Sequence, residues 1–233
     1  VYVARPPLYK IKRRKTEQYI EDDTEMSQIL LKLGAEDVTL VRNSDNQAFS
    51  GEIVNQLVKI LSRLETLGGG VRRYGCDLLR YLHRYDPEIK KLPRYLARIR
   101  TGNVEEFRFF TDAEAREGFF EGQGIPAEER EGTISRELEE NGQFVRQRIS
   151  VHEIFEANEM EKILEEISGH GINLEDFETG EETANYKLVE KMGVEGKEKE
   201  TGIKSLLEIL ENIRAFGRKG LQIQRYKGLG EMN

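Results

Sequence analysis

The spacing of apolar residues along this chain changes from a strand period to a helix period and back again. Apolar residues alternate near the beginning, in VYVARPPLYKIKRRKTEQYI (1–20), and again at the end, in LQIQR (221–225). Intervals of four, three and four residues, typical of one face of a helix, separate four positions in between: Ile53, Leu57, Ile60 and Leu64. A chain that carries both periods in separate segments is predicted to be an α+β protein.

Capping residues and glycines mark the expected helix ends. One helix should begin at Asp22 or Asp23 as N-cap and end at Gly34 as C-cap. A second helix, the one with apolar positions from Ile53 to Leu64, is predicted to stop at Gly68–Gly70. A further helix is expected within PEIKKLPRYLARIR (87–100), with Pro93 interrupting or restarting it.

The clearest hairpin signal in the chain is Asn141-Gly142, because this dipeptide tolerates the positive φ angles of a type I′ turn. Residues 173–200 are polar and weakly periodic, so we expect a loop that contains a short helix. A strongly amphipathic helix is predicted from Ile203 to Ile213, before the final strand.

The balance of charges limits the partners of this chain. Its net charge of −7 argues against a dedicated nucleic-acid binder. The charges are uneven, however: residues 10–15 and 72–100 are basic, and acidic residues dominate 105–140. One face of the molecule could therefore meet phosphates while the remainder repels them.

The location of the chain can also be inferred from its sequence. No apolar run approaches the ~18 to 20 residues that span a bilayer, and no signal peptide is visible, so we expect no membrane contact. The single Cys76 excludes an internal disulfide and favours a reducing, cytoplasmic setting. Because the chain opens in a strand-like run without an initiator Met, we expect it to be a piece of a longer protein.

No self-contained active site can be recognised. The three histidines, His83, His152 and His170, lack a ligand-like spacing, and no Asp-x-Asp occurs. There is no Walker-type glycine loop, and no nucleophile has a partnered histidine in a known motif. We therefore predict no catalytic residue and no metal site in this chain.

The final segment, QRYKGLGEMN, has features that suit an anion. Arg225 and Lys227 alternate on a predicted strand, with Tyr226 on the opposite side. Gly228 and Gly230 allow close backbone approach and positive φ, so that amide groups can face a phosphate.

This ending resembles the signature of the B subunits of bacterial type IIA topoisomerases, the family of DNA gyrase and topoisomerase IV. The beginning, VYVARPPLYKIKRRKTEQYI, is similar to the Pro-Pro-Leu-Tyr segment of the same metal-binding toprim domain. In the family these segments are close neighbours, whereas here roughly 200 residues separate them. That arrangement resembles the gyrase B subunits that carry a large insertion inside toprim.

The resemblance implies a domain organisation. Residues 1–23 would supply toprim strands, residues 24–200 an insert domain, and residues 201–233 a helix and strand returning to toprim. The expected fold is therefore α+β, with a partial toprim sheet formed by the two chain ends and carrying a mixed helix and hairpin insert. The first and last strands should lie side by side.

The resemblance also implies an activity for the parent enzyme, the ATP-dependent introduction of negative supercoils by passage of duplex DNA through a double-strand break. Mg²⁺ and ATP are the cofactors of the parent, and its partner is the gyrase A subunit in an A2B2 assembly. In the family, the magnesium-binding acidic residues lie upstream of the Pro-Pro segment, the ATPase domain is separate, and the nucleophilic tyrosine belongs to the A subunit. This chain alone is therefore expected to be inactive and to bind none of these cofactors.

Two roles remain open for the chain itself. The first is a scaffold that contacts DNA, and its candidate residues come from the terminal motif and the basic stretches: Arg225, Lys227, Gly228, Gly230, Lys12, Arg13, Arg14, Arg72 and Arg73. The alternative is a protein-interaction module, in which the acidic stretch 105–140 docks on the A subunit or modulates DNA binding. An independent hydrolase or nuclease is disfavoured because no active-site motif is present.

Overall fold

The computed structural model describes residues 7–13, 16–140, 142–177, 184–191 and 198–226. Within these ranges the chain forms six α-helices and eleven strands, and the strands make three antiparallel sheets. The predicted α+β class is confirmed. None of the helices in the described ranges is both long enough and apolar enough to cross a membrane.

The chain divides into two compact units, which are described separately. Unit 1 comprises residues 1–62 and 175–233, and unit 2 comprises residues 63–174. The division into 1–23, 24–200 and 201–233 concerns the domains of a parent protein and stays a prediction.

Unit 1 holds two of the sheets, with strand orders β11-β1-β2 and β10-β9-β3-β4. Its elements are β1 (Tyr9–Arg13), β2 (Thr16–Ile20), α1 (Asp23–Gly34), β3 (Val38–Arg42), β4 (Ala48–Ser50), the first half of α2 (Glu52–Arg73), β9 (Tyr186–Lys191), β10 (Glu198–Ile203), α6 (Leu206–Arg218) and β11 (Gln222–Arg225). A 3-10 turn, η2 (Leu174–Phe177), stands at the boundary with unit 2.

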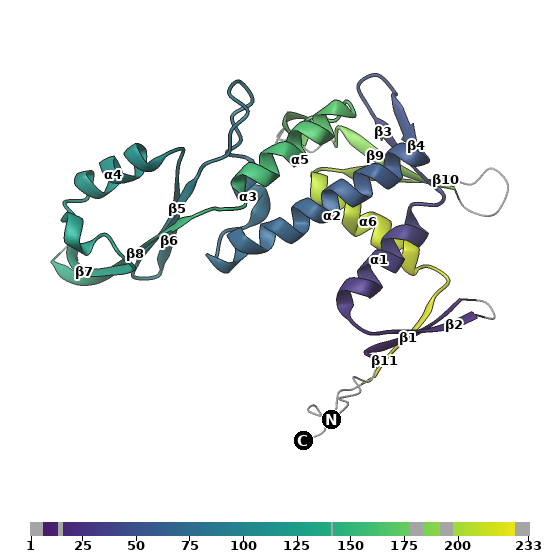
Figure 1. Cartoon of the computed structure of the whole chain (residues 1–233), viewed down its shortest axis with the longest axis horizontal. Helices are drawn as coiled ribbons and strands as arrows, with labels where there is room; N and C mark the ends of the chain where they lie inside the picture. Colours follow the sequence, from purple (N-terminus) through teal and green to yellow (C-terminus); the bar gives the residue numbers. More distant parts are fainter. Residues whose placement is uncertain (1–6, 14–15, 141, 178–183, 192–197, 227–233) are drawn as a thin grey trace. The chain divides into compact units, whose positions relative to one another are not determined.

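The first and last strands of the described chain lie side by side. Strand β1 pairs antiparallel with β11, with Tyr9 opposite Arg225 and Ile11 opposite Ile223. On its other edge β1 pairs with β2 to form a hairpin. Figure 1 shows β11 returning to β1 after the rest of the chain. This prediction is confirmed for the described strands, whereas the strand expected at Val1 and Val3 lies outside the described residues.

Two glycines bring α1 and α6 into backbone contact. A Cβ atom on Gly34 would overlap the carbonyl oxygen of Ile213 in α6, and one on Gly217 would overlap the carbonyl oxygen of Leu30 in α1. Figure 1 shows the two helices crossing directly beside each other. The C-cap role predicted for Gly34 is wrong, because Gly34 is the last helical residue and the cap is Ala35. Its lack of a side chain serves packing instead.

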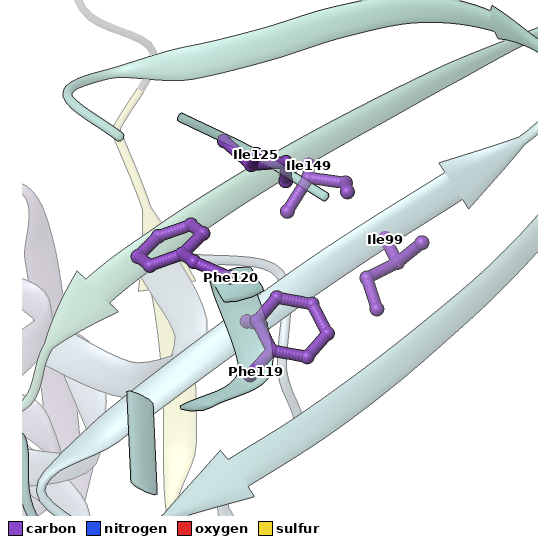
Figure 2. Packing of buried hydrophobic residues seen from close by; sticks show 6 residues of the cluster. Ile99, Phe119, Phe120, Ile125 and Ile149 are labelled. Carbon is purple, nitrogen blue, oxygen red and sulfur yellow. The ribbon is translucent and has the colours of Figure 1, made fainter. Parts of the chain in front are cut away.

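Unit 2 contains a four-stranded sheet with the order β6-β5-β8-β7. Its elements are the end of α2, α3 (Leu78–Leu82), β5 (Tyr95–Thr101), β6 (Val104–Phe110), α4 (Ala113–Gly122), the 3-10 turn η1 (Ala127–Glu129), β7 (Thr133–Glu140), β8 (Gln143–Glu153) and α5 (Ala157–Gly169). Figure 2 shows Phe119 and Phe120 of α4 packed with Ile99 of β5 and Ile149 of β8. This cluster is the core beneath one face of the sheet.

The Asn-Gly hairpin prediction is confirmed. Strands β7 and β8 pair across the turn, and Gly142 has the expected positive φ of 77°. The helix expected within 87–100 is wrong, because Tyr95–Thr101 forms β5, the central strand between β6 and β8. Pairing on both edges outweighs a weak local preference for helix.

The described parts of the polar segment 173–200 contain more regular structure than the sequence indicates. They contain η2, as the expected short helix, but also β9 and the start of β10. Strand β9 is internal to its sheet, paired with both β3 and β10. The expectation of a loop is therefore wrong for Tyr186–Lys191.

Helix α2 continues through the three glycines that were predicted to stop it. It ends only at Arg73. A Cβ atom on Gly68 would overlap the side chain of Leu78, and one on Gly70 would overlap the carboxylate of Glu156. Gly68 and Gly70 therefore make room for neighbouring side chains, and none of the three glycines ends the helix.

A buried carboxylate connects α5 to the segment that leads into β5. Glu161 is 6% exposed. It accepts hydrogen bonds from the Leu92 amide at 3.0 Å and from the Lys91 ammonium at 3.2 Å, and it pairs with the Arg94 guanidinium at 2.9 Å. A buried charge is tolerated when its partners are as complete as these.

Replacing Gly34 or Gly217 by Ala is expected to lower the free energy of unfolding by about 1–3 kcal/mol, because overpacking a close contact costs that much. Urea unfolding followed by circular dichroism measures the change. The matched control is Gly69→Ala in α2, where an added Cβ meets nothing within 4 Å. That substitution should stabilise the chain by up to about 1 kcal/mol. Equal stability of all three variants would contradict the close helix contact.

Replacing Glu161 by Ala is expected to cost about 3–5 kcal/mol, because it leaves the Arg94 charge without its partner in a partly buried site. The control is Glu165→Ala, which removes an exposed pair with Lys90 at 3.7 Å. An exposed pair contributes at most about 1 kcal/mol. Similar unfolding midpoints for the two variants would show that the Glu161 network is not a stabilising feature.

Candidate nucleic-acid interface

The sheet β11-β1-β2 has one buried face. In an antiparallel sheet, directly paired residues project to the same side. Ile11 and Ile20, which are buried, pack against Met26 and Leu30 of α1. Tyr9 projects to this side as well, and its hydroxyl donates a hydrogen bond to Asp23. Helix α1 therefore covers this side of the sheet.

The opposite side of the sheet, here called the polar face, carries cationic, amide and aromatic side chains. It consists of Lys10, Lys12, Glu17, Tyr19, Gln222, Gln224 and Tyr226. The register places Lys10 between Tyr19 and Gln224, and Lys12 between Glu17 and Gln222. A hollow of about 320 Å³ lies over these strands, lined mostly by polar-face residues.

Aromatic rings border the polar face at one end. The rings of Tyr19 and Tyr226 stack with their centroids 6.5 Å apart, and the Lys10 ammonium lies 5.7 Å from the Tyr19 ring centroid. Tyr19 is 56% exposed. Tyr19 is therefore open to a partner, whereas Lys10 and Tyr226 are partly exposed.

One carboxylate lies between the two lysines. Glu17 is 2.7 Å from the Lys10 ammonium and 3.6 Å from that of Lys12. The hydrogen bond between Lys10 and Glu17 raises the pKa of Lys10 and lowers the pKa of Glu17. Two lysines and one glutamate give this part of the face a formal charge of one positive unit. Ammonium and amide donors beside exposed rings are groups that contact phosphates and sugars.

The predicted cationic residues of the chain ends do not all share this face. Lys12 belongs to it. Arg13 projects to the α1 side, where its guanidinium lies 3.7 Å from the carboxylate of Glu36. Arg225 lies over the ring of Tyr9 at 5.9 Å, also on the α1 side. As the alternation predicts, Tyr226 lies on the side opposite to Arg225.

Four of the predicted residues have no described position. Arg14, Lys227, Gly228 and Gly230 lie outside the described residues. Their assignment to DNA contact stays a prediction.

Arg72 and Arg73 stand at the end of α2 and belong to unit 2, whereas the predicted residues of the chain ends belong to unit 1. The Arg72 guanidinium donates to the carbonyl oxygen of Glu65 at 2.8 Å. That of Arg73 donates to the carboxylate of Glu156 at 3.4 Å. Both head groups therefore have partners within their own unit.

Sequence reasoning missed the polar companions of Lys10 and Lys12. Gln222, Gln224 and Tyr19 belong to the same face only because β11, β1 and β2 pair in this register. The period-two alternation of each strand was visible in the sequence, but the register between strands at opposite ends of the chain was not.

Residue types that hold metals or react covalently include His152 and Cys76, which have defined places in the described part of the chain. No cluster of three or more His, Cys, Asp or Glu side chains there is placed to hold a metal ion. His152 lies against Tyr74 with ring centroids 4.0 Å apart, and burial lowers the pKa of His152. Cys76 is buried, and burial raises the pKa of its thiol to about 11.

The sequence is similar to a known family model and to several known proteins. The family model described as "GyrB, hook" matches residues 7–33, which contain β1, β2 and most of α1. Over the whole chain, the DNA gyrase B subunit of Chlamydia pneumoniae is 25% identical, and the type 2 topoisomerase B subunit of Aquifex aeolicus is 28% identical. The DNA gyrase B subunit of Campylobacter jejuni is 27% identical.

The chain spans about a quarter of the length of these curated relatives, 26%, 26% and 25% respectively. The resemblance to DNA gyrase B subunits that was inferred from the two ends is confirmed, and the similarity extends over the whole of this chain.

The thiol of Cys76 is expected to resist labelling in the folded chain. With a pKa of about 11, on the order of one thiol in a thousand is ionised at pH 8, and only the thiolate reacts readily. Reaction with a chromogenic disulfide reagent at pH 8 should be slow without urea and fast in unfolding concentrations of urea. Fast labelling of the folded chain would contradict the burial of this side chain.

Proposed function

We propose that this chain acts within a DNA gyrase B subunit as a scaffold that contacts duplex DNA. The observation that carries the proposal is the pairing of β1 with β11, which joins the two chain ends and creates the polar face from both of them. The similarity to gyrase B subunits along the whole chain supports the same assignment.

In this proposal, residues 1–23 and 201–233 belong to a toprim sheet, and residues 24–200 form an inserted domain. A long insertion is compatible with the host sheet because closing a loop costs only ~0.6 kcal/mol more for each doubling of its length. The paired strands and the glycine contact between α1 and α6 hold the two points where the insertion leaves and returns.

The parent enzyme would introduce negative supercoils by ATP-dependent passage of one duplex through another, with Mg²⁺ and with gyrase A subunits in an A2B2 assembly in the cytoplasm. The described residues do not fit a role in holding the metal, since they offer no cluster of ligands for it. No chemical step of that reaction is therefore assigned to this chain, and its proposed part is positioning.

DNA contact is assigned first to the ammonium groups of the polar face. Lys12 and its neighbour Lys10 project from β1 beside glutamine amides and two tyrosine rings. Arg14 and the Lys-Gly-x-Gly segment from Lys227 to Gly230 are proposed to extend this contact. Arg13 and Arg225 project to the opposite, α1 side of the sheet, so any contact that they make with DNA would be separate from the polar face. Within the basic stretch 72–100, Arg72 and Arg73 are the residues proposed from the sequence.

A protein-interaction role is the second candidate. In the acidic stretch 105–140, arginines of unit 2 already pair with Glu105, Glu106 and Glu117. Glu128 and Glu129 are exposed on η1, and the described residues provide neither with an ion-pair partner. These two carboxylates could dock on a basic surface of an A subunit.

The chain is expected to bind a 30-base-pair duplex weakly and without sequence preference, with a dissociation constant near 10⁻⁴–10⁻⁶ M at physiological salt. Fluorescence anisotropy at several salt concentrations gives the slope of log K against log salt. The double variant Lys10→Gln/Lys12→Gln should lower the magnitude of this slope by about two units, because each lost phosphate contact removes about 0.9.

Lys162→Gln is the matched control, since Lys162 is an exposed lysine of unit 2 that pairs with Glu159 at 3.3 Å. Its slope should equal that of the unchanged chain. Absence of any complex at low salt, or an equal slope for the lysine double variant, would overturn the DNA-contact role.

The interaction role is tested by pull-down with purified A subunit. Reversal of charge in Glu128→Lys/Glu129→Lys should abolish capture if these carboxylates form the contact. Unchanged capture, or no capture by the original chain, would remove this alternative.

A further inference from the structure

Most arginines of unit 2 have their charge matched by a carboxylate. These residues are Arg63, Arg73, Arg94, Arg98, Arg100, Arg108, Arg116 and Arg130. Among the described residues of unit 2, six arginines have no carboxylate within ion-pair distance: Arg72, Arg80, Arg84, Arg136, Arg146 and Arg148. Two of the six, Arg80 and Arg84, are distinguished by aromatic rings that lie against their guanidinium groups. These two residues, here called the arginine pair, are exposed.

The arginine pair is held by aromatic rings instead. The guanidinium carbon of Arg80 lies 4.8 Å from the ring centroid of Phe107, and that of Arg84 lies 5.3 Å from the ring centroid of Phe109. Phe107 and Phe109 alternate on β6 and so project to the same side of the sheet. A guanidinium that lies on a ring is fixed in place while its N–H donors at the edge stay available.

Acidic groups close in sequence to these residues are engaged with other partners. Asp86, two residues after Arg84, accepts hydrogen bonds from the amides of Glu88 and Ile89, and Glu106, next to Phe107, lies 2.8 Å from Arg108. Asp77 caps α3 by accepting hydrogen bonds from the amides of Leu79 and Arg80. Glu105, two residues before Phe107 on β6, lies 2.7 Å from Arg98 and 3.2 Å from Arg100. None of these carboxylates is therefore positioned to neutralise the arginine pair.

The placement of the arginine pair also concentrates positive charge. Arg80 is the third residue of α3, and Arg84 lies two residues after the helix ends. Their ring partners, Phe107 and Phe109, are two positions apart on β6, which brings two like charges to the same side of that strand. In a chain of net charge −7, two such cations without an acidic partner indicate a site for an external anion.

We propose that Arg80 and Arg84, supported by Phe107 and Phe109, bind neighbouring phosphates of a duplex DNA backbone. This inference rests on the proposed DNA-contact function and adds a second surface to it, on unit 2. Duplex DNA presents one negative charge per about 1.7 Å of its axis, so a pair of fixed guanidinium groups can meet phosphates in many registers. The planar donor fork of arginine matches phosphate oxygens in pairs.

The test uses the complete 233-residue chain and a 30-base-pair duplex in anisotropy titrations from low to moderate salt. Arg80→Gln/Arg84→Gln should lower the magnitude of the salt slope by about two units. Arg80→Lys/Arg84→Lys should keep the slope but weaken binding severalfold, because an ammonium keeps the charge but loses the planar fork. Thermal unfolding verifies that the variants stay folded.

Arg63→Gln/Arg108→Gln is the control, since it removes the same charge from two arginines that pair with carboxylates. This variant should retain the original slope. A slope that falls for Arg72→Gln/Arg73→Gln but not for the arginine pair would assign the contact to the former and overturn the inference.

The remaining outcomes also decide the matter. If the original chain binds DNA through Lys10 and Lys12 while Arg80→Gln/Arg84→Gln leaves the slope unchanged, only this inference fails. If the original chain forms no complex, the proposed function fails with it. If the substitutions weaken binding of polyglutamate as much as binding of DNA, the surface fits an acidic protein and the phosphate assignment is wrong.

Discussion

The contact of α1 with α6 through two glycines is the constraint on which unit 1 depends. Gly34 and Gly217 allow the two helix backbones to touch, and a larger residue at either position would force the backbones apart. Helix α1 follows β2 and α6 precedes β11, so this contact sets where the chain leaves the three-stranded sheet and where it returns. The pairing of β1 with β11 completes the closure.

This closure also gives the protein its proposed surface. The polar face exists only because strands from the two ends share one register, which places Lys10 and Lys12 beside Gln222 and Gln224. Unit 2 also has a proposed cationic surface. Most of its arginines pair with carboxylates, whereas the arginine pair lies against aromatic rings. In unit 1 the cationic residues Lys10 and Lys12 lie on a strand, β1, and in unit 2 the rings that contact the arginine pair lie on a strand, β6.

Sequence patterns predicted the elements whose signals are local. The Asn-Gly turn, the N-cap of α1 and the amphipathic face of α6 each depend on neighbouring residues, and the structure contains all three. Glycines were misread because Gly34 and Gly68 satisfy packing with distant partners, which no local pattern reveals. Strands β5 and β9 were missed for the same reason, since each is stabilised by strands on both edges. The sequence indicated a basic stretch at residues 10–15, but it did not reveal the register of β11, β1 and β2 that forms the polar face.

The most direct test of the account is a disulfide between the first and last strands. Lys12 and Gln222 are directly paired, so Lys12→Cys/Gln222→Cys places two Cα atoms within about 4.4–6.8 Å, the range a disulfide accepts. Mild oxidation should join them efficiently, whereas Lys12→Cys/Gln224→Cys, shifted by two residues, should react poorly. Buried Cys76 should not compete. Equal cross-linking of both variants, or none in either, would contradict the pairing of the two chain ends.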